Sequence, residues 1–360
     1  MLRRLLGPFE IRDSFRWLAR AGLVREDLRE DLSFLRALQR FVAPLPWVDG
    51  EHPLSTDLFP PFRPFRVAAL DGKKVGVVAT GGSGAMVCAL GVIRACEEAG
   101  LDLAGISSCS GSALALAPVA AGLDAQQAAE FILGWRDGEH LELDRGALRR
   151  MLLDRWRRVV GVTSAAPLER LLVERLGDLR LGELPLPFYA NVWDIDHNRV
   201  LFLGARTSPE LPLALATRAA VSLAGFVSPV RIDGAWCSDG GIVNIFPVDP
   251  LVDHHPEIDY YIGVNAFYPE GFAGEDITGW YDEPGCILRG GRQTYTCTHI
   301  EVARQQLRRI EDRCLLLHPL SYREVDGLRL YELMLDRTRW PEFITAGHRH
   351  ARAALEALDG

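Results

Sequence analysis

The chain lacks any run of about 18 consecutive apolar residues within its 360 residues, and a helix needs a run of that length to cross a bilayer. We therefore expect no transmembrane helix. The N-terminal stretch from Met1 to Pro8 is too short for a secretory signal, and charged residues follow it directly. These absences favour a protein that stays in the cytoplasm, and peripheral contact with a membrane surface stays open.

Metal-binding and redox motifs are also missing. The seven cysteines are scattered, with no C-x-x-C pair and no Cys/His cluster at zinc spacing. We therefore expect reduced thiols and neither a metal nor a cofactor.

Lysine is nearly absent, because Lys73 and Lys74 are the only two, and the formal net charge is -8. An acidic chain of this kind is not expected to bind nucleic acid.

Hydrophobic residues make up 48% of the chain, which is enough for a large core. Short apolar runs alternate with helical patterns, and this alternation predicts an α/β fold with a mostly parallel sheet. The expected strands are residues 75–79, 103–106, 188–192, 200–203 and 260–264. The expected helices are residues 85–99, 211–224, 299–313 and 341–358, one that begins near residue 113, and several within 125–178.

The most informative segment predicts a nucleophile elbow. Leu103 to Ile106 has the composition of a buried strand, and a helix of small residues begins near Ala113. A strand that turns into a helix through small residues lifts a hydroxyl or thiol onto the helix N-terminus, where the N–H groups favour negative charge. The usual pattern is G-x-S-x-G. Centred on Ser110, this chain has Ser108 and Ser112 at the two glycine positions, so a plain Ser/Gly-rich loop stays open as the alternative.

A second glycine-containing loop, Thr80 to Gly84, also joins a strand to a helix. A phosphate-binding P-loop is excluded because the loop has no lysine, and a dinucleotide fingerprint fails because it would need Gly or Ala at Val87. An oxyanion hole remains, since glycine lets the backbone approach a tetrahedral oxyanion closely. A simple tight turn is the alternative.

A third segment, Trp236 to Ile242, carries Asp239 in front of two glycines. This pattern indicates a carboxylate exposed at a turn. Taken alone, an ordinary Asp-Gly-Gly turn is the more common explanation.

In this order along the chain, the three segments resemble the patatin-like acyl hydrolases, a family related to the catalytic domain of cytosolic phospholipases. Its pattern is a G-G-G-x-R/K-G loop, a G-x-S-x-G elbow and a D-G-G/A motif. Gly91 to Gly100 is similar to the family's first helix, and Ile106 to Gly122 fits its elbow and elbow helix without a gap. Leu223 to Asp239 resembles the approach to the family aspartate, and the resemblance extends over about residues 73–268.

The resemblance implies a three-layer α/β/α fold and a serine acyl hydrolase without a cofactor. Ser110 would be the nucleophile and would form an acyl-enzyme, with Asp239 as general base and no intervening histidine. The backbone amides of Gly81, Gly82 and Ser83 would hold the oxyanion.

The chain departs from the family pattern in three ways. The cation of the glycine loop is replaced by Gly84, or by Ala85 under a one-residue shift, which points away from phosphate and toward uncharged esters, thioesters or carrier-bound acyl chains. The first elbow glycine is Ser108, which we expect to strain the turn. Cys109 precedes Ser110, and a frame shifted by one reads x-Cys-x-Gly with Gly111. Cys109 is therefore the alternative nucleophile, with a small buried core residue as its other explanation.

Three functions follow from these residues. The leading one is hydrolysis of a lipid ester, thioester or carboxylester. The second is an acyltransferase, or a cyclising or condensing enzyme of a biosynthetic pathway, that uses the same acyl-enzyme. The third is a catalytically inactive acyl-binding protein. Contact with an acyl-carrier protein stays open in each.

We expect two regions along the chain. Residues 1–70 combine a helical pattern over 11–42 with a proline-rich stretch over 44–64, and form an extension that acts as a lid or a docking surface. Residues 71–360 form the acyl hydrolase domain.

Overall fold

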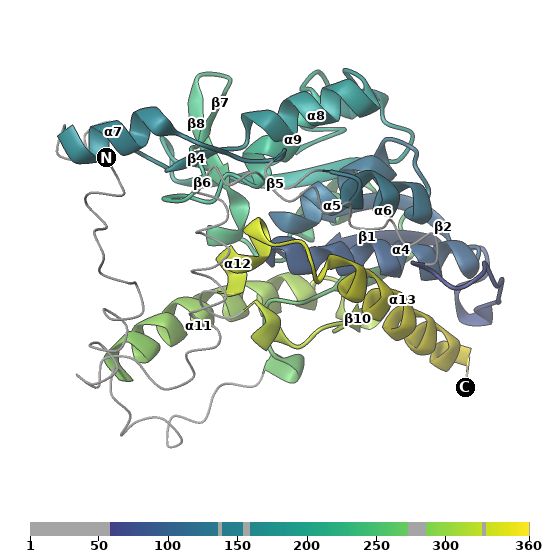
Figure 1. Ribbon diagram of the computed structural model, residues 1–360. Helices are drawn as coiled ribbons and strands as arrows, with labels where there is room; N and C mark the ends of the chain where they lie inside the picture. Colours follow the sequence, from purple (N-terminus) through teal and green to yellow (C-terminus); the bar gives the residue numbers. More distant parts are fainter. Residues whose placement is uncertain (1–57, 136–138, 154–158, 273–285, 326–328, 360) are drawn as a thin grey trace.

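A central sheet organises the fold (Figure 1). The computed structural model describes residues 58–135, 139–153, 159–272, 286–325 and 329–359. Within these ranges the sheet has eight strands in the order β10-β9-β1-β2-β5-β8-β7, with β6 paired to β5. The helix expected over residues 11–42 and most of the proline-rich stretch lie outside the described residues.

The strands and helices are bounded as follows. The strands of the sheet are β1 (Lys74–Ala79), β2 (Asp102–Ser108), β5 (Phe188–Asp194), β6 (Arg199–Gly204), β7 (Val230–Ile232), β8 (Ala235–Asp239), β9 (Tyr260–Val264) and β10 (Cys314–Leu317), and β3 (Glu142–Leu143) pairs separately with β4 (Thr163–Ser164). The α-helices are α4 (Cys88–Glu98), α5 (Gly111–Ala120), α6 (Ala125–Leu133), α7 (Arg145–Leu153), α8 (Ala166–Leu176), α9 (Leu213–Ala220), α10 (Asp249–His254), α11 (Cys286–Arg308), α12 (Arg329–Leu335) and α13 (Trp340–Glu356).

Parallel pairing dominates the middle of the sheet. β1 pairs in parallel with β2 and β9, β9 with β10, and β2 with β5, whereas β5 pairs antiparallel with β6 and β8, and β8 with β7. The predicted α/β class with a mostly parallel sheet is confirmed. In the register of β1 with β2, Ala79 lies opposite Ser108. The loops that follow these two strands therefore leave the sheet at the same edge, where α/β folds place their ligand sites.

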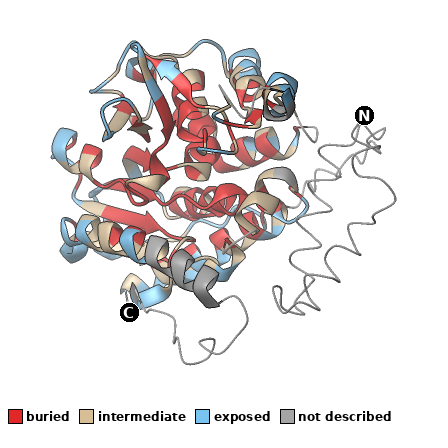
Figure 2. Cartoon of the chain, turned by 90° about the vertical axis from the view of Figure 1, so that its left-hand side faces the viewer, coloured by how far each residue is buried: buried red, intermediate tan, exposed pale blue. Residues whose placement is uncertain are grey.

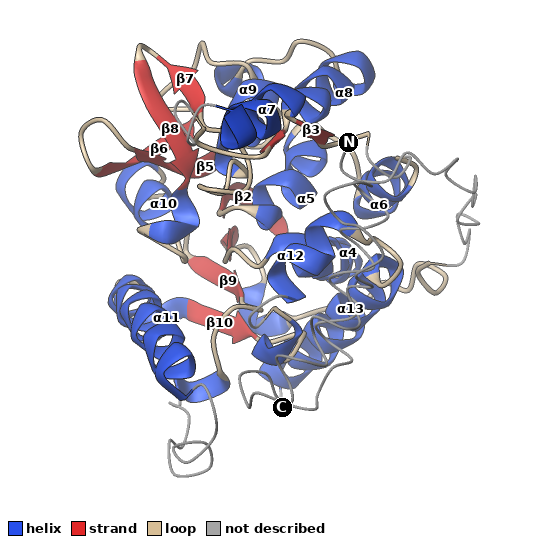
Figure 3. Cartoon of the chain, turned by 60° about the vertical axis from the view of Figure 1, so that its left-hand side comes forward, coloured by secondary structure: helices blue, strands red, loops and turns tan. Residues whose placement is uncertain are grey.

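Helices cover both faces of the sheet, as expected for three layers. Figure 3 shows α10 and α11 on one side of the strands and α4, α5, α6 and α13 on the other. The alternation within β1 matches this arrangement, because Val75 and Val77 join the core under α4 and α5, and Val78 joins the core under α10 and α11. Figure 2 shows the buried residues concentrated along the middle of the molecule.

Helices α4 and α13 pack with their backbones in direct contact. A Cβ atom on Gly91 of α4 would lie 2.0 Å from the carbonyl oxygen of Ile344, and one on Gly347 of α13 would lie 2.0 Å from that of Cys88. Glycine at both positions lets the two backbones touch. The C-terminal helix is thus part of the main core.

The residues before β1 pack on the same core. Leu58, Phe59, Val67 and Leu70 are buried there, and the N–H groups of Ala68 and Ala69 donate to the Asp359 carboxylate at 2.7 and 2.9 Å. The division at residue 70 into an extension and a domain stays a prediction. No helix among the described residues is both long and apolar enough to traverse a bilayer.

Candidate active site

Ser110 lies at the turn between β2 and α5, where the sequence predicts the elbow. Its backbone has φ 53° and ψ -124°, a left-handed conformation that residues with a Cβ rarely adopt. The next residue must be glycine, because a Cβ on Gly111 would lie 1.9 Å from the carbonyl oxygen of Ser83. The side chain of Ser110 is therefore placed at the start of α5, next to the loop that follows β1.

The serines that replace the elbow glycines tie the turn to its neighbouring strands. The Ser108 hydroxyl donates to the carbonyl oxygen of Tyr189 on β5 at 2.9 Å. The Ser112 hydroxyl lies 3.2 Å from the carbonyl oxygen of Ala79 on β1, and it accepts a bond from the Cys109 N–H at 2.8 Å. Ser108 was expected to strain the turn. It lies instead at the end of β2, where a side chain has room and a partner.

Asp239 is the last residue of β8, and not part of an exposed turn as the Asp-Gly-Gly pattern indicated. β8 pairs with β5, where Val192 lies opposite Asp239. The side chain is only 2% exposed. Its carboxylate accepts a hydrogen bond from the Gly241 N–H at 2.8 Å. Burial raises the pKa of Asp239 to about 6, although the Ser110 hydroxyl and the Gly241 N–H both act to lower it.

Cys109 belongs to the buried hydrophobic core. A Cβ added to either Gly81 or Gly241 would lie 3.3 Å from its sulfur. Burial raises the pKa of this thiol well above its usual value, and the nearby charge of Asp239 raises it further. Since the thiolate is the reactive form, the structure disfavours Cys109 as the alternative nucleophile.

The three residues expected to form the oxyanion hole differ in their hydrogen bonding. The Gly81 N–H already donates to the carbonyl oxygen of Ile245, at 3.3 Å. Gly82, with φ 152°, precedes a 3₁₀-helix, η2 (Ser83–Val87). The first N–H groups of a helix have no partner within it, so those of Gly82 and Ser83 are the better placed donors.

The position of the family's loop cation is filled by the C-terminal part of the chain. A Cβ on Gly84 would lie 2.3 Å from both the Leu333 carbonyl oxygen and the Nε1 atom of Trp340. Trp340 Nε1–H in turn donates to that same carbonyl at 3.3 Å. A long basic side chain does not fit at Gly84 in this arrangement.

Ser110 and Asp239 lie in the wall of a pocket with a volume of about 860 Å³, which includes its open mouth. Its other lining is mostly apolar and comes from several elements: Leu114 of α5, Leu168 of α8, Val221 and Leu223 after α9, Ile242 and Ile245 after β8, Phe267, and Leu330, Met334 and Trp340 from α12 and α13. Within the described part of the chain, no lysine or arginine is among the lining residues. Such a lining suits a hydrocarbon chain.

Sequence reasoning missed the pocket residues outside the motifs. His140, Leu330 and Met334 lie in regions that carried no motif, and only the fold brings them to the elbow. His140 Nε2 lies 2.9 Å from the carbonyl oxygen of Met334 and so joins the two walls. Among the described residues, no group of three or more His, Cys, Asp or Glu side chains is arranged to hold a metal ion.

Comparison with known proteins adds a family match. The model of the patatin-like phospholipase family matches residues 77–252. An uncharacterised NTE family protein of Mycobacterium tuberculosis is 24% identical over 201 residues, which cover 56% of this chain and 52% of that protein. The lysophospholipase nte1 of Aspergillus niger is 25% identical over 197 residues, which cover 55% of this chain and 12% of that protein. The match thus spans about half of the first relative and a small part of the second.

Among solved structures, VipD from Legionella pneumophila aligns with a TM-score of 0.48 and 14% identity, over 79% of this chain and 67% of that one. Human GIVD cytosolic phospholipase A2 aligns with a TM-score of 0.40 and 13% identity, over 94% of this chain and 63% of that one.

Proposed function

Since residues 77–252 of this chain belong to the patatin-like phospholipase family, we propose that the protein hydrolyses the acyl ester bond of a lipid, with Ser110 as nucleophile and Asp239 as general base. One observation carries this proposal: Ser110 and the buried Asp239 lie together in the wall of an apolar pocket, where the serine hydroxyl acts on the pKa of the carboxylate. A carboxylate with a pKa of about 6 is a stronger base than an ordinary aspartate.

The reaction takes two steps at this pair. The Ser110 oxygen attacks the acyl carbonyl and its proton passes to Asp239, while the N–H groups of Gly82 and Ser83 bind the oxyanion. The C–O bond to the leaving alcohol then breaks, and the alcohol takes the proton from Asp239. Water next attacks the acyl-enzyme and gives a proton to Asp239. The bond between the acyl carbon and the Ser110 oxygen then breaks, Asp239 returns the proton to that oxygen, and the fatty acid leaves.

We propose a lipid with a single acyl chain as the substrate. The apolar lining takes the chain, and the names of the fungal relatives as lysophospholipases support this class. Because the described residues that line the pocket include no lysine or arginine, we expect a charged head group to lie outside it. A monoacylglycerol and a lysophospholipid are therefore the substrates to compare first.

The test of the nucleophile is peptide mass spectrometry after treatment with a long-chain fluorophosphonate. We expect one adduct, on Ser110, and no adduct in Ser110→Ala. In Asp239→Asn, labelling should be at least about 100-fold slower, because the base is lost. Cys109→Ser, the matched variant at the adjacent residue, should still be labelled. An adduct on Cys109 would contradict the assignment, and the complete absence of an adduct would favour the acyl-binding alternative.

Product analysis separates hydrolysis from acyl transfer. With a lysophospholipid as substrate, free fatty acid should form and should remain the main product when a competing alcohol or amine is added. If the acyl group moved mainly to the added acceptor, the acyltransferase would be the correct assignment.

A further inference from the structure

Ser83 occupies a position whose backbone conformation glycine would adopt without strain. It begins η2 directly after Gly82, lines the pocket, and its backbone lies against Gly111 of the elbow. Its φ is 55°, in the left-handed region where a Cβ is unfavourable. A serine here is therefore strained, whereas a glycine would not be.

The hydroxyl of Ser83 is also unsatisfied. Ser83 is only 8% exposed, and its Oγ is buried without a hydrogen-bond partner. A buried hydroxyl normally has a partner, since leaving one unpaired lowers the stability of the fold. Backbone strain and an unpaired hydroxyl thus coincide at one residue of the pocket wall, which is the pattern expected when the missing partner is a ligand.

The N–H donors of the glycine loop indicate that the missing partner of the Ser83 hydroxyl is an oxyanion. The Gly81 N–H, one of the donors that the loop would offer to an oxyanion, is engaged by the Ile245 carbonyl. A hydroxyl two residues along the loop can replace it, because side-chain donors serve in oxyanion holes as backbone donors do.

We propose that the Ser83 hydroxyl donates a hydrogen bond to the oxyanion of the tetrahedral intermediate, as a side-chain donor beside the backbone N–H groups of Gly82 and Ser83. This inference rests on the proposed acyl hydrolase function. In the free protein the Ser83 hydroxyl is buried, so the proposal requires a change of staggered rotamer about the Cα–Cβ bond when substrate binds.

Two substitutions test the role of the hydroxyl. Ser83→Gly removes both hydroxyl and strain, and Ser83→Ala removes the hydroxyl alone. In both, kcat for a monoacyl ester should fall about 100-fold with KM within about 3-fold of wild type, as for loss of a donor that acts only in the transition state. Ser83→Gly should melt no lower than Ser83→Ala. Asp233→Gly is the matched control, since Asp233 also has a positive φ, of 49°, but lies at the exposed turn between β7 and β8; its kcat should equal that of wild type.

A purely structural role for Ser83 would leave kcat of Ser83→Gly at the wild-type value, and that result would overturn the inference while leaving the hydrolase standing. A wild-type protein with neither ester turnover nor a fluorophosphonate adduct would overturn both. A crystal structure of the wild-type fluorophosphonate adduct would test the position of the Ser83 hydroxyl without any substitution. Ser83 Oγ should lie within hydrogen-bond distance of the phosphonyl oxygen, and an Oγ still turned away from it would refute the proposal.

Discussion

At the scale of single residues, the environment of Asp239 distinguishes it from the aspartate of an ordinary Asp-Gly-Gly turn, because it sets the pKa of the carboxylate. The side chain is buried, yet it accepts a hydrogen bond from the Gly241 N–H and shares the pocket wall with Ser110. Burial disfavours the charged form more than these two groups favour it, so the pKa rises from 3.8 to about 6. A base in this range is half ionised at mildly acidic pH.

The dependence of activity on pH follows from that value. As the general base, Asp239 must be ionised, so kcat/KM should fall tenfold per pH unit below about pH 6 and level off above pH 7. The measurement is the pH profile of ester hydrolysis by the wild type. In Asp239→Asn the remaining activity should show no inflection near pH 6. A wild-type profile that stays flat down to pH 4 would show that another group is the base.

The raised pKa of Asp239 makes folding stability fall as pH rises, whereas activity should increase with pH. Because the folded pKa lies above the unfolded one, the folded state holds its proton more tightly. The resulting stabilisation is complete below about pH 4 and is lost as pH rises through about 6, a change of about 3 kcal/mol. Asp239→Asn should therefore unfold at higher denaturant concentration than wild type at pH 8, with the difference shrinking toward pH 4.

The sequence predicted that Ser110 and Asp239 act together, but it could not tell which of Cys109 and Ser110 faces the pocket. Ser110 and Asp239 each follow from a motif, and both line the same pocket in the structure. Cys109 and Ser110 are adjacent in the chain, so sequence alone leaves either as nucleophile. Only the left-handed turn at Ser110 determines which side chain faces the pocket and which faces the core.

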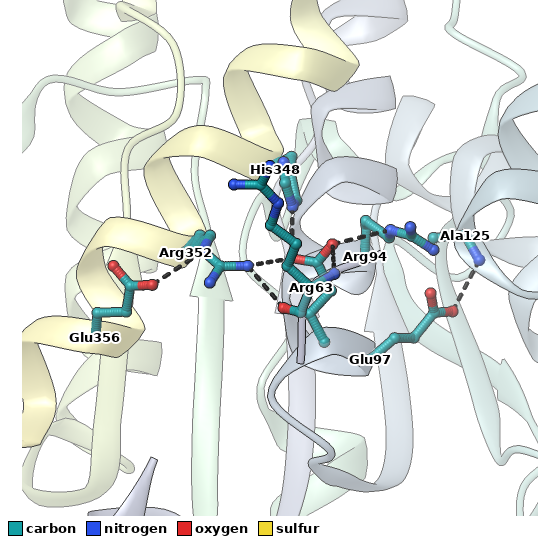
Figure 4. A network of polar contacts seen from close by, with 8 residues as sticks. Arg63, Arg94, Glu97, Ala125, His348, Arg352 and Glu356 are labelled. Atoms are coloured by element: carbon teal, nitrogen blue, oxygen red, sulfur yellow. Dashed lines mark hydrogen bonds and ion pairs between the residues drawn. The ribbon is translucent and has the colours of Figure 1, made fainter. Parts of the chain in front are cut away.

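At the scale of elements, a buried carboxylate joins α4, α13 and the segment before β1 (Figure 4). Glu98 has a fully buried side chain and accepts bonds from His348 Nε2 at 2.9 Å and from Arg352 Nη1 at 2.8 Å. Arg94 Nε lies 3.4 Å from Glu98 Oε1. Arg352 also donates to the carbonyl oxygen of Arg63. Burial acts to raise the pKa of Glu98, but the bonds from His348 and Arg352 outweigh it and the pKa is lowered.

Glu98→Gln should therefore destabilise the fold strongly. The substitution leaves Arg352 without its buried counter-charge and removes the carboxylate partner of His348 Nε2, and breaking a buried ion pair from one side costs about 3–5 kcal/mol. Urea unfolding measures the loss. Glu356→Gln is the matched control, because Glu356 pairs with the same Arg352 through a side chain that is 50% exposed, and its loss should stay below about 1 kcal/mol. Equal losses in the two variants would show that the Glu98 cluster does not hold these elements together.

The success of prediction at this scale depended on the length and composition of each segment. β1, β9 and the β5–β6 pair have clear apolar patterns, and they were found within about two residues. β8 was missed because Ala235 to Asp239 combines a half-exposed Trp236 with small polar residues and no alternation. β10 was missed because a run of four residues fits a helix end as well as a strand.

At the scale of the whole molecule, the chemistry and the pocket come from different parts of the chain. The elbow, the glycine loop and Asp239 lie within the family match of residues 77–252. Leu330, Met334 and Trp340 lie beyond it, yet they complete the pocket over η2. The motifs therefore predicted the residues of the candidate site, whereas the pocket wall beyond them depends on long-range packing that no local pattern records.

This division predicts that α12 sets the acyl-chain length. Met334 is half-buried in the pocket wall, so Met334→Trp would fill space otherwise taken by about three methylene groups, each worth about 0.8 kcal/mol when buried. The ratio of kcat/KM for p-nitrophenyl palmitate to that for p-nitrophenyl butyrate should then fall by roughly 50-fold. Thr338→Trp adds the same ring at an exposed residue between α12 and α13 and should leave the ratio unchanged. An unchanged ratio in Met334→Trp would mean that the chain leaves the elbow by another route, and that the C-terminal elements close the core without touching the substrate.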